Sequence, residues 1–137
     1  MSRGDRGQVT AFVATVMLAL FVLAGLVIDG GYALAARRRA IDEANGAARA
    51  GGQAVDLAAY RATGAFHLDP AGAIAAARAY MAPTGHEATV AIVGDRVQVR
   101  VTIAQPMALL GVVGIDELTV SGRGEARSVR GPGSPAP

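Results

Sequence analysis

The sequence contains no cysteine and no tryptophan, and all 13 of its basic residues are arginine. Without cysteine there is no disulfide, no thiolate metal ligand and no thiol nucleophile. Three phenylalanines and three tyrosines are too few for the mixed aromatic and basic surface that binds nucleic acid. The two histidines, His67 and His86, stand alone, outside any HExxH or nucleophile pattern. We therefore expect no catalytic residues, no cofactor, no metal, no nucleic acid and no small-molecule substrate, so the chain is not expected to be an enzyme.

What the sequence does contain is a long uncharged run, Val9 to Ile28, of 20 residues. A helix of this length spans roughly 30 Å, the thickness of the hydrocarbon core of a bilayer. Its apolar residues leave no polar stripe, which suits a helix surrounded by lipid. A buried core helix is the alternative, but a chain of 137 residues cannot easily surround one. The run therefore predicts a transmembrane helix at 9–28.

Two kinds of processing are consistent with this helix. Ala33-Leu34-Ala35 resembles a signal-peptide cleavage site, but the apolar run exceeds the roughly 7–15 residues of a cleavable signal. We therefore expect an uncleaved signal anchor. Arg6 lies close to the run, whereas the cluster 37–39 lies well beyond it, and long C-terminal segments translocate largely regardless of charge. These features predict a single-pass protein of the cytoplasmic membrane, with residues 1–8 in the cytoplasm and an extracytoplasmic domain at 29–130.

Residues 29 to about 59 are rich in alanine and arginine, which predicts that the helix continues into the outer domain. Glycines in this stretch mark places for a bend or a close neighbour, because each costs about 1 kcal/mol relative to alanine. Four small residues spaced four apart form a ladder: Ala40, Ala44, Ala48 and Gly52. One interpretation is a helix-packing interface with other subunits, since small residues let backbones approach closely. The other is packing on the chain's own strands near Gly122 and Gly124.

The remainder of the outer domain predicts a shorter helix and a small sheet. Asp69-Pro70 is typical of a helix start, and the helix is expected to end near Met81. Residues 96–103 alternate apolar and polar side chains, and Gly94-Asp95 predicts a hairpin turn just before them. Pairing outward from this turn sets three apolar pairs on one face: Ile92 with Val97, Val90 with Val99, and Ala88 with Val101. The predicted class is α+β and pilin-like, with about three antiparallel strands.

The third strand is expected from Leu118 to about Ser128, with a buried face of small residues that leaves room for a close-lying helix. Before it lies an unusually apolar connection, residues 105–117, in which Pro106 can open a short helix. This connection either covers the end of the core or meets the membrane surface or a partner. The end of the chain, 131–137, is expected to be a disordered tail.

The order of these features resembles that of the TadE/TadG-like proteins of tight-adherence (Flp) pilus assembly. The resemblance rests on residues 6–54, a short basic start, the apolar run, an arginine cluster and an alanine-rich helix, and it extends more loosely over 75–126. It implies a pilin-like subunit without catalytic activity. TadE-type pseudopilins carry a glutamate five residues after the glycine at the peptidase cut, whereas Gly7 is followed at that distance by Phe12. The N-terminus is therefore closer to the TadG type.

These observations predict a membrane-anchored, pseudopilin-like structural component of Tad/Flp-type pilus assembly or a related secretion apparatus. Its expected partners are the lipid bilayer and other Tad pilus assembly proteins or pseudopilins. The alternative is a stand-alone anchored or secreted protein of the bacterial envelope, whose small domain binds a ligand or a cell-wall component.

Overall fold

The computed structural model of the chain describes residues 3–128, with side chains from Gly7 onward, so the tail predicted at 131–137 lies outside the described residues. The chain divides into two compact units. The first combines Met1–Ala35 with Ala104–Leu118, and the second combines Ala36–Ile103 with Thr119–Pro137. This division reflects compactness and not position in a membrane, so the topological boundaries at residues 8 and 28 stay predictions.

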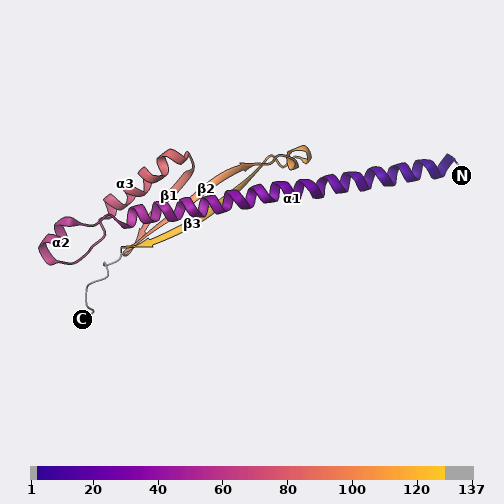
Figure 1. The fold of residues 1–137 in the computed structure, drawn as a ribbon. Coiled ribbons are helices and arrows are strands. Elements are labelled where there is room, and N and C mark those ends of the chain that lie inside the picture. Colours follow the sequence, from indigo (N-terminus) through magenta and orange to yellow (C-terminus); the bar gives the residue numbers. More distant parts are fainter. Residues whose placement is uncertain (1–2, 129–137) are drawn as a thin grey trace, which may run out of the picture. The chain divides into compact units, whose positions relative to one another are not determined.

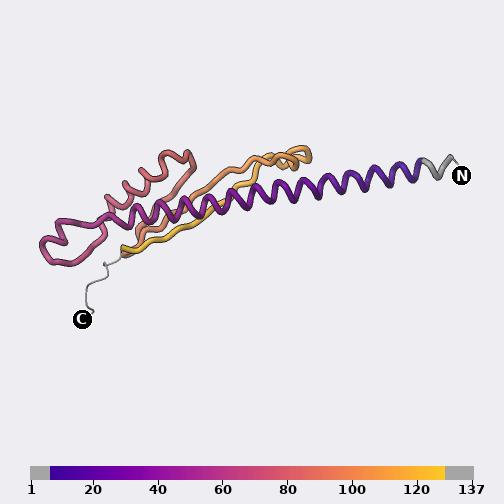
Figure 2. The backbone as a smooth tube through the Cα atoms, viewed as in Figure 1, coloured from indigo at the N-terminus to yellow at the C-terminus, as the bar shows by residue number. Residues whose placement is uncertain are grey.

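Three α-helices, two 3-10 helices and three strands follow one another along the described part of the chain (Figure 1). They are α1 (Arg3–Gly52), α2 (Leu57–Thr63), α3 (Pro70–Met81), η1 (Ala82–Thr84), β1 (Glu87–Val93), β2 (Arg96–Pro106), η2 (Leu110–Val113) and β3 (Glu117–Arg127). The backbone tube in Figure 2 traces this path from the indigo α1 to the yellow β3. The three strands form one sheet in the order β1-β2-β3. The predicted α+β class is confirmed.

The first helix, α1, is continuous over 50 residues, and the glycine pair Gly30-Gly31 does not interrupt it. It ends at Gly52, so the prediction of helix as far as Ala59 is wrong. Val55 instead forms an isolated bridge with Leu68. Asp56 takes an extended conformation and its carboxylate accepts the first free amides of α2. The physical reason is that an aspartate at this position satisfies a new helix start better than it continues an old helix.

The third helix, α3, begins and ends where the sequence predicts. The carboxylate of Asp69 accepts a hydrogen bond from the Ala71 amide at 3.1 Å, and Pro70 occupies the first turn. Its inward face is made of Ala73, Ala77 and Met81, all buried.

The hairpin of β1 and β2 has the predicted register. The two strands pair antiparallel with Val90 opposite Val99, and Gly94 in the turn has a φ of 62°, which suits glycine. The inward residues of β2 are almost fully excluded from solvent: Val97, Val99, Val101 and Ile103. Turn chemistry and alternation therefore agree on which face of the sheet is buried.

The core of the second unit combines this sheet face with alanines of α1 and the inward face of α3. Strand β3 contributes two buried glycines, Gly122 and Gly124, in place of side chains. A Cβ atom added at Gly122 would collide with the backbone of Ala40 and Ile41, and one at Gly124 with the backbone of Ala44. The small face predicted for the third strand thus allows helix α1 to lie directly on the strand backbone.

Candidate functional site

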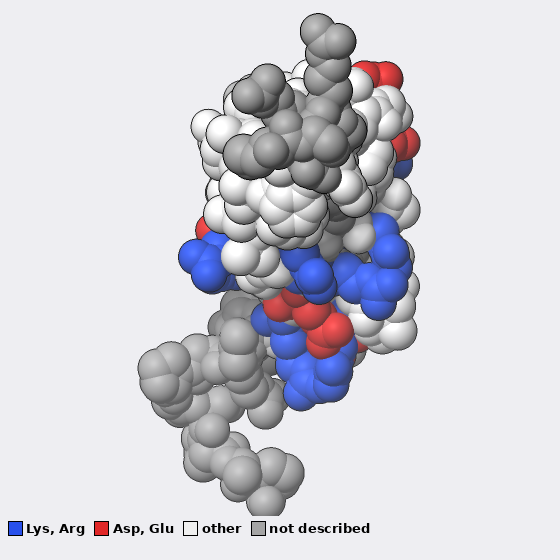
Figure 3. Space-filling view, turned by 90° about the vertical axis from the view of Figure 1, so that its right-hand side faces the viewer, with Lys and Arg blue, Asp and Glu red and all other residues white. Residues whose placement is uncertain are grey.

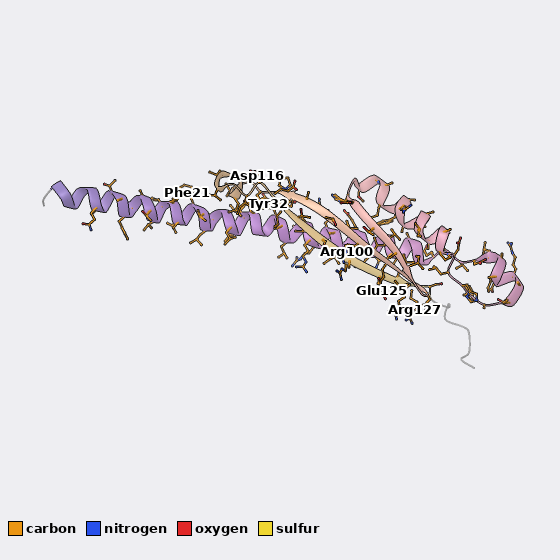
Figure 4. All side chains as sticks on the ribbon, turned by 180° about the vertical axis from the view of Figure 1, so that it is seen from behind. Phe21, Tyr32, Arg100, Asp116, Glu125 and Arg127 are labelled. Atoms are coloured by element: carbon orange, nitrogen blue, oxygen red, sulfur yellow. The ribbon has the colours of Figure 1, made fainter. Side chains whose placement is uncertain are left out.

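The N-terminal part of α1 exposes its large apolar side chains. Phe21 is 74% exposed and Val27 is 75% exposed, and Figure 4 shows Phe21 on this part of the helix. The hydroxyl of Thr15 donates to the Ala11 carbonyl at 2.9 Å, so this polar group is satisfied within the helix. Among the described residues, α1 is the one helix long and apolar enough to cross a membrane. Bulky apolar exposure on all sides is what a helix in lipid requires.

The first unit, which includes this part of α1, also contains a closed apolar loop, residues 107–115, between β2 and β3. The Met107 amide donates to the Asp116 carbonyl at 2.9 Å, which closes the base of the loop. Within it, η2 ends at Gly114, whose φ of 89° lies in the left-handed region. The sequence suggested that Pro106 opens a short helix. This prediction is wrong, because β2 extends through Pro106 and η2 begins only at Leu110. We refer to residues 107–115 as the apolar loop.

Asp29 of α1 holds the apolar loop through three backbone amides. Its Oδ1 accepts from the Ala108 amide at 2.9 Å, and its Oδ2 accepts from the amides of Leu109 at 2.9 Å and Leu110 at 2.7 Å. The side chain is completely buried, and η2 has no capping side chain of its own at Leu109. A carboxylate supplied by α1 therefore caps a helix start in a distant part of the sequence.

One turn earlier on the same side of α1, Gly25 provides the space that the loop occupies. A Cβ atom at Gly25 would lie 3.2 Å from the Cβ of Leu109, tighter than ordinary packing. Beside this contact lies an apolar groove of about 390 Å³, lined by Leu18, Phe21, Val22, Ala24, Gly25, Leu109, Leu110, Val112 and Val113. Sequence reasoning missed this site. The signals that could have found it are the lone acid directly after an apolar run and the apolar connection at 105–117.

The small-residue ladder proposed as an interface lies in the core of the second unit. Ala40, Ala44 and Ala48 have no exposed surface, and Gly52 lies against Ala126 of β3. The structure therefore brings these four residues together against the chain's own strand, the alternative arrangement stated above. A partner helix would have to displace β3 to reach them. Contact with other subunits through the ladder stays a prediction.

The outer face of the sheet carries paired charges. Arg96 donates from Nη1 to Oε1 of Glu125 at 2.7 Å, and Gln98 donates to Oε2 at 3.1 Å. These hydrogen bonds hold the pKa of the Glu125 carboxyl below its usual value, and the bond from Arg96 has the larger effect. Arg127 pairs with Asp95 at 3.2 Å. Figure 3 shows acidic side chains flanked by basic ones, and Figure 4 shows Arg100, Glu125 and Arg127 along the sheet.

A shallow cleft of about 430 Å³ lies on the same outer face. Its charged residues, Arg100, Arg123 and Glu125, are all exposed. Exposed charges are typical of a solvated surface, where each interaction is weak. The cleft therefore gives no specific support to ligand binding.

The two histidines occupy different settings. Nδ1 of His86 lies 2.8 Å from Oε2 of Glu43, joining the segment before β1 to α1. The backbone carbonyl of His67 accepts the Asp56 amide at 2.9 Å. Within the described residues there is no group of three or more side chains able to hold a metal ion. His86 thus has a packing partner that the sequence did not suggest.

Comparison with known proteins finds a likeness in the N-terminal segment. A family described as putative Flp pilus-assembly TadE/G-like matches residues 7–54. No match is found among curated proteins or among solved structures. The predicted TadE/TadG-like resemblance is confirmed over this range, whereas its extension to residues 75–126 and the closer likeness to the TadG type stay predictions.

The matched segment contains the exposed apolar stretch, Asp29 and the small-residue ladder, all on α1. A long apolar helix within such a segment fits a membrane-anchored component of Flp (Tad) pilus assembly. Over residues 7–54, which make up most of α1, the chain is similar to the family described as putative Flp pilus-assembly TadE/G-like.

Proposed function

We propose that the chain is a pseudopilin-like structural subunit of Flp-type pilus assembly, or of a related secretion apparatus, without catalytic activity. The observation that carries this proposal is the dual use of α1. Its residues 9–28 expose bulky apolar side chains suited to lipid, while Ala40, Ala44 and Ala48 are buried beneath the sheet. One helix therefore supplies both the membrane anchor and a central part of the domain core, and the TadE/G-like match covers both parts.

The proposal includes an orientation, with the N-terminus in the cytoplasm and the sheet outside. Arg6 next to the apolar stretch supports it, as does the tendency of long C-terminal segments to translocate. The absence of cysteine from the sequence makes a labelling test clean. Single cysteines at Ser2 and at Ser121, which is exposed on β3, are treated in intact cells with a membrane-impermeant maleimide. Labelling of S121C but not S2C is expected; the reverse pattern would reject this orientation.

The function itself is tested by deletion of the gene in the source organism and complementation. Loss of surface fibres in electron micrographs, restored by the wild-type chain, is the expected result. A strain that keeps its full complement of fibres would reject the pilus role and favour a stand-alone envelope protein. The control is complementation with an Arg37→Gln variant, which changes an exposed position. This variant should restore the fibres as the wild-type chain does.

A further inference from the structure

The apolar loop exposes large hydrophobic side chains instead of burying them. Val112 is 87% exposed, Val113 is 54% exposed and Ile115 is 49% exposed, in a segment without any charged residue from 107 to 115. A contiguous exposed apolar patch of this kind marks contact with a membrane or another protein. The identity of the occupant follows from where the loop is held.

The loop lies beside the stretch of α1 that is suited to the hydrocarbon core. Its side chains share a groove with Leu18, Phe21 and Val22, and Leu109 contacts Gly25. At the rise of an α-helix these positions lie roughly 4–15 Å before Ile28, the end of the apolar run. If residues 9–28 span the bilayer, the tip of the loop is at the depth of the acyl chains. The exposed surfaces of loop and helix are therefore continuous.

The backbone of the loop is also prepared for surroundings without water. Its amides donate to carbonyls or to Asp29 at Met107, Ala108, Leu109, Leu110, Val112, Gly114 and Ile115. Irregular backbone enters the hydrocarbon region only where its polar groups are satisfied by protein. Asp29 satisfies three of these amides at once, and its carboxylate is itself completely buried. Asp29 thus supplies the acceptor that water would otherwise supply to these amides.

We propose that the apolar loop is a second membrane-inserted element, which enters the leaflet nearest Asp29 beside α1 and is held there by the Asp29 carboxylate. The occupant of its exposed face is the acyl region of the lipid. A second copy of α1 is the competing occupant, but the continuity with the lipid-facing helix and the hydrogen bonds of seven loop amides favour lipid. The proposal rests on the membrane anchor of the proposed function and not on its role in a pilus.

Depth-dependent quenching tests this directly. The full chain, with one cysteine carrying an environment-sensitive fluorophore, is reconstituted in phosphatidylcholine and phosphatidylglycerol vesicles. The probe is placed at Val112, at Met17 in the spanning stretch, or at exposed Ser121 on β3. We expect V112C to resemble M17C, with quenching by lipid-borne nitroxide severalfold above that of S121C and little quenching by aqueous iodide.

The other outcomes separate the possible failures. Iodide quenching of V112C equal to that of S121C, with M17C in lipid, would overturn the inserted loop and leave the anchor intact. Aqueous quenching of M17C as well would overturn both the loop proposal and the membrane-anchored function. Protection of V112C from both quenchers would mean that a protein neighbour covers the loop, which also overturns the proposal.

The role of Asp29 is tested in the V112C background. Asp29→Ala leaves three amides without their acceptor, so we expect iodide quenching of the probe to rise severalfold. Asp42→Ala, which removes an exposed acid from the same helix, should leave the quenching unchanged. If quenching of the M17C and S121C probes is the same in the Asp29→Ala chain as in wild type, the anchor and the sheet are intact. Equal quenching in the two alanine variants would overturn the assignment of Asp29.

Discussion

Two stretches of α1 follow opposite rules of side-chain size within one helix. Residues 9–28 are bulky and exposed, as at Phe21 and Val27. In the second stretch, residues 36–52, every buried position is alanine or glycine, as at Ala40 and Ala44, which have no exposed surface. The difference lies in the neighbour: lipid adapts to any side chain, whereas the backbone of β3 approaches so closely that only small residues fit.

The exceptions in the first stretch support this explanation. Gly25 is buried within it and Asp29 is buried directly after it, one small and one charged, and both lie where the apolar loop covers the helix. Size and polarity along α1 therefore report which surface meets protein and which meets lipid. Substitutions that exchange the two rules should have the largest effects.

The largest effect is expected when bulk is placed in the second stretch. Ala44→Leu with Ala48→Leu keeps high helix propensity but overpacks two sites with no exposed surface. Overpacking costs about 1–3 kcal/mol at each site, so the free energy of unfolding should fall by roughly 2–6 kcal/mol. Thermal and denaturant unfolding of the full chain in detergent, followed by circular dichroism, measures the loss.

The control is Arg49→Leu on the exposed side of the same helix, which should change the unfolding free energy little. Crosslinking of the membrane-embedded chain distinguishes the two interpretations of the ladder. Unfolding unchanged in the double variant, together with lost crosslinks to other proteins, would contradict packing on β3 and favour an interface between subunits.

A charge placed in the first stretch should break it by a different mechanism. Leu20 is 56% exposed in the apolar run, and an arginine near mid-span costs about 2.5–3.5 kcal/mol on insertion scales. Leu20→Arg should therefore reduce the share of the chain in the membrane fraction. Leu34→Arg, at a position equally exposed but beyond the run, should insert normally. Equal membrane fractions for the two variants would contradict a lipid-spanning segment at 9–28.

A smaller effect on stability is expected from alanine substitutions at two glycines of the second stretch, Gly51 and Gly46. A Cβ atom at Gly51 would lie 2.8 Å from the Ala73 carbonyl oxygen, a backbone atom that cannot move aside easily. At Gly46 the three nearest atoms belong to the ring end of Tyr80, a side chain that is 48% exposed. Alanine gains about 1 kcal/mol of helix propensity in a helix interior, as at Gly46, and less at Gly51 next to the end of α1.

We therefore expect Gly51→Ala to destabilise the chain by about 1 kcal/mol, because overpacking outweighs propensity. Gly46→Ala should be neutral or slightly stabilising. The two variants are compared by their midpoints of denaturation in the same detergent. Equal midpoints would show that closeness to backbone is not what requires glycine in this helix.

Sequence patterns predicted the elements whose causes are local. The hairpin register follows from Gly94-Asp95 and the alternation beside it, and the start of α3 follows from Asp69-Pro70. The glycines of β3 correctly predicted a close-lying helix. Which helix packs there remained open, because a ladder of small residues suits an internal strand and a partner helix equally well.

Interactions between distant residues could not be predicted in this way. Asp29 and the amides that it accepts are 79 to 81 residues apart, and His86 and Glu43 are 43 residues apart. No local pattern relates such pairs, since either partner alone is consistent with a solvated surface residue. The end of α1 was missed for a different reason. A helix-cap signal at Asp56 competes with the alanine-rich composition around it, and the cap prevails.

The smallest expected effect concerns Glu125 on the outer face of the sheet, where exposure weakens any interaction. Its pKa is lowered in the folded chain, chiefly by Arg96, so its contribution to stability is present above the usual glutamate value of about 4.3. That contribution is lost as the pH falls through the lower folded-state pKa. Glu125→Gln should therefore lower the melting temperature slightly at pH 7, and the difference from wild type should shrink on acidification to about pH 3. An Arg96→Gln background provides the control, since without the guanidinium the Glu125→Gln difference at pH 7 should itself be smaller. A difference that stays constant with pH would mean that ionisation of Glu125 does not contribute to stability.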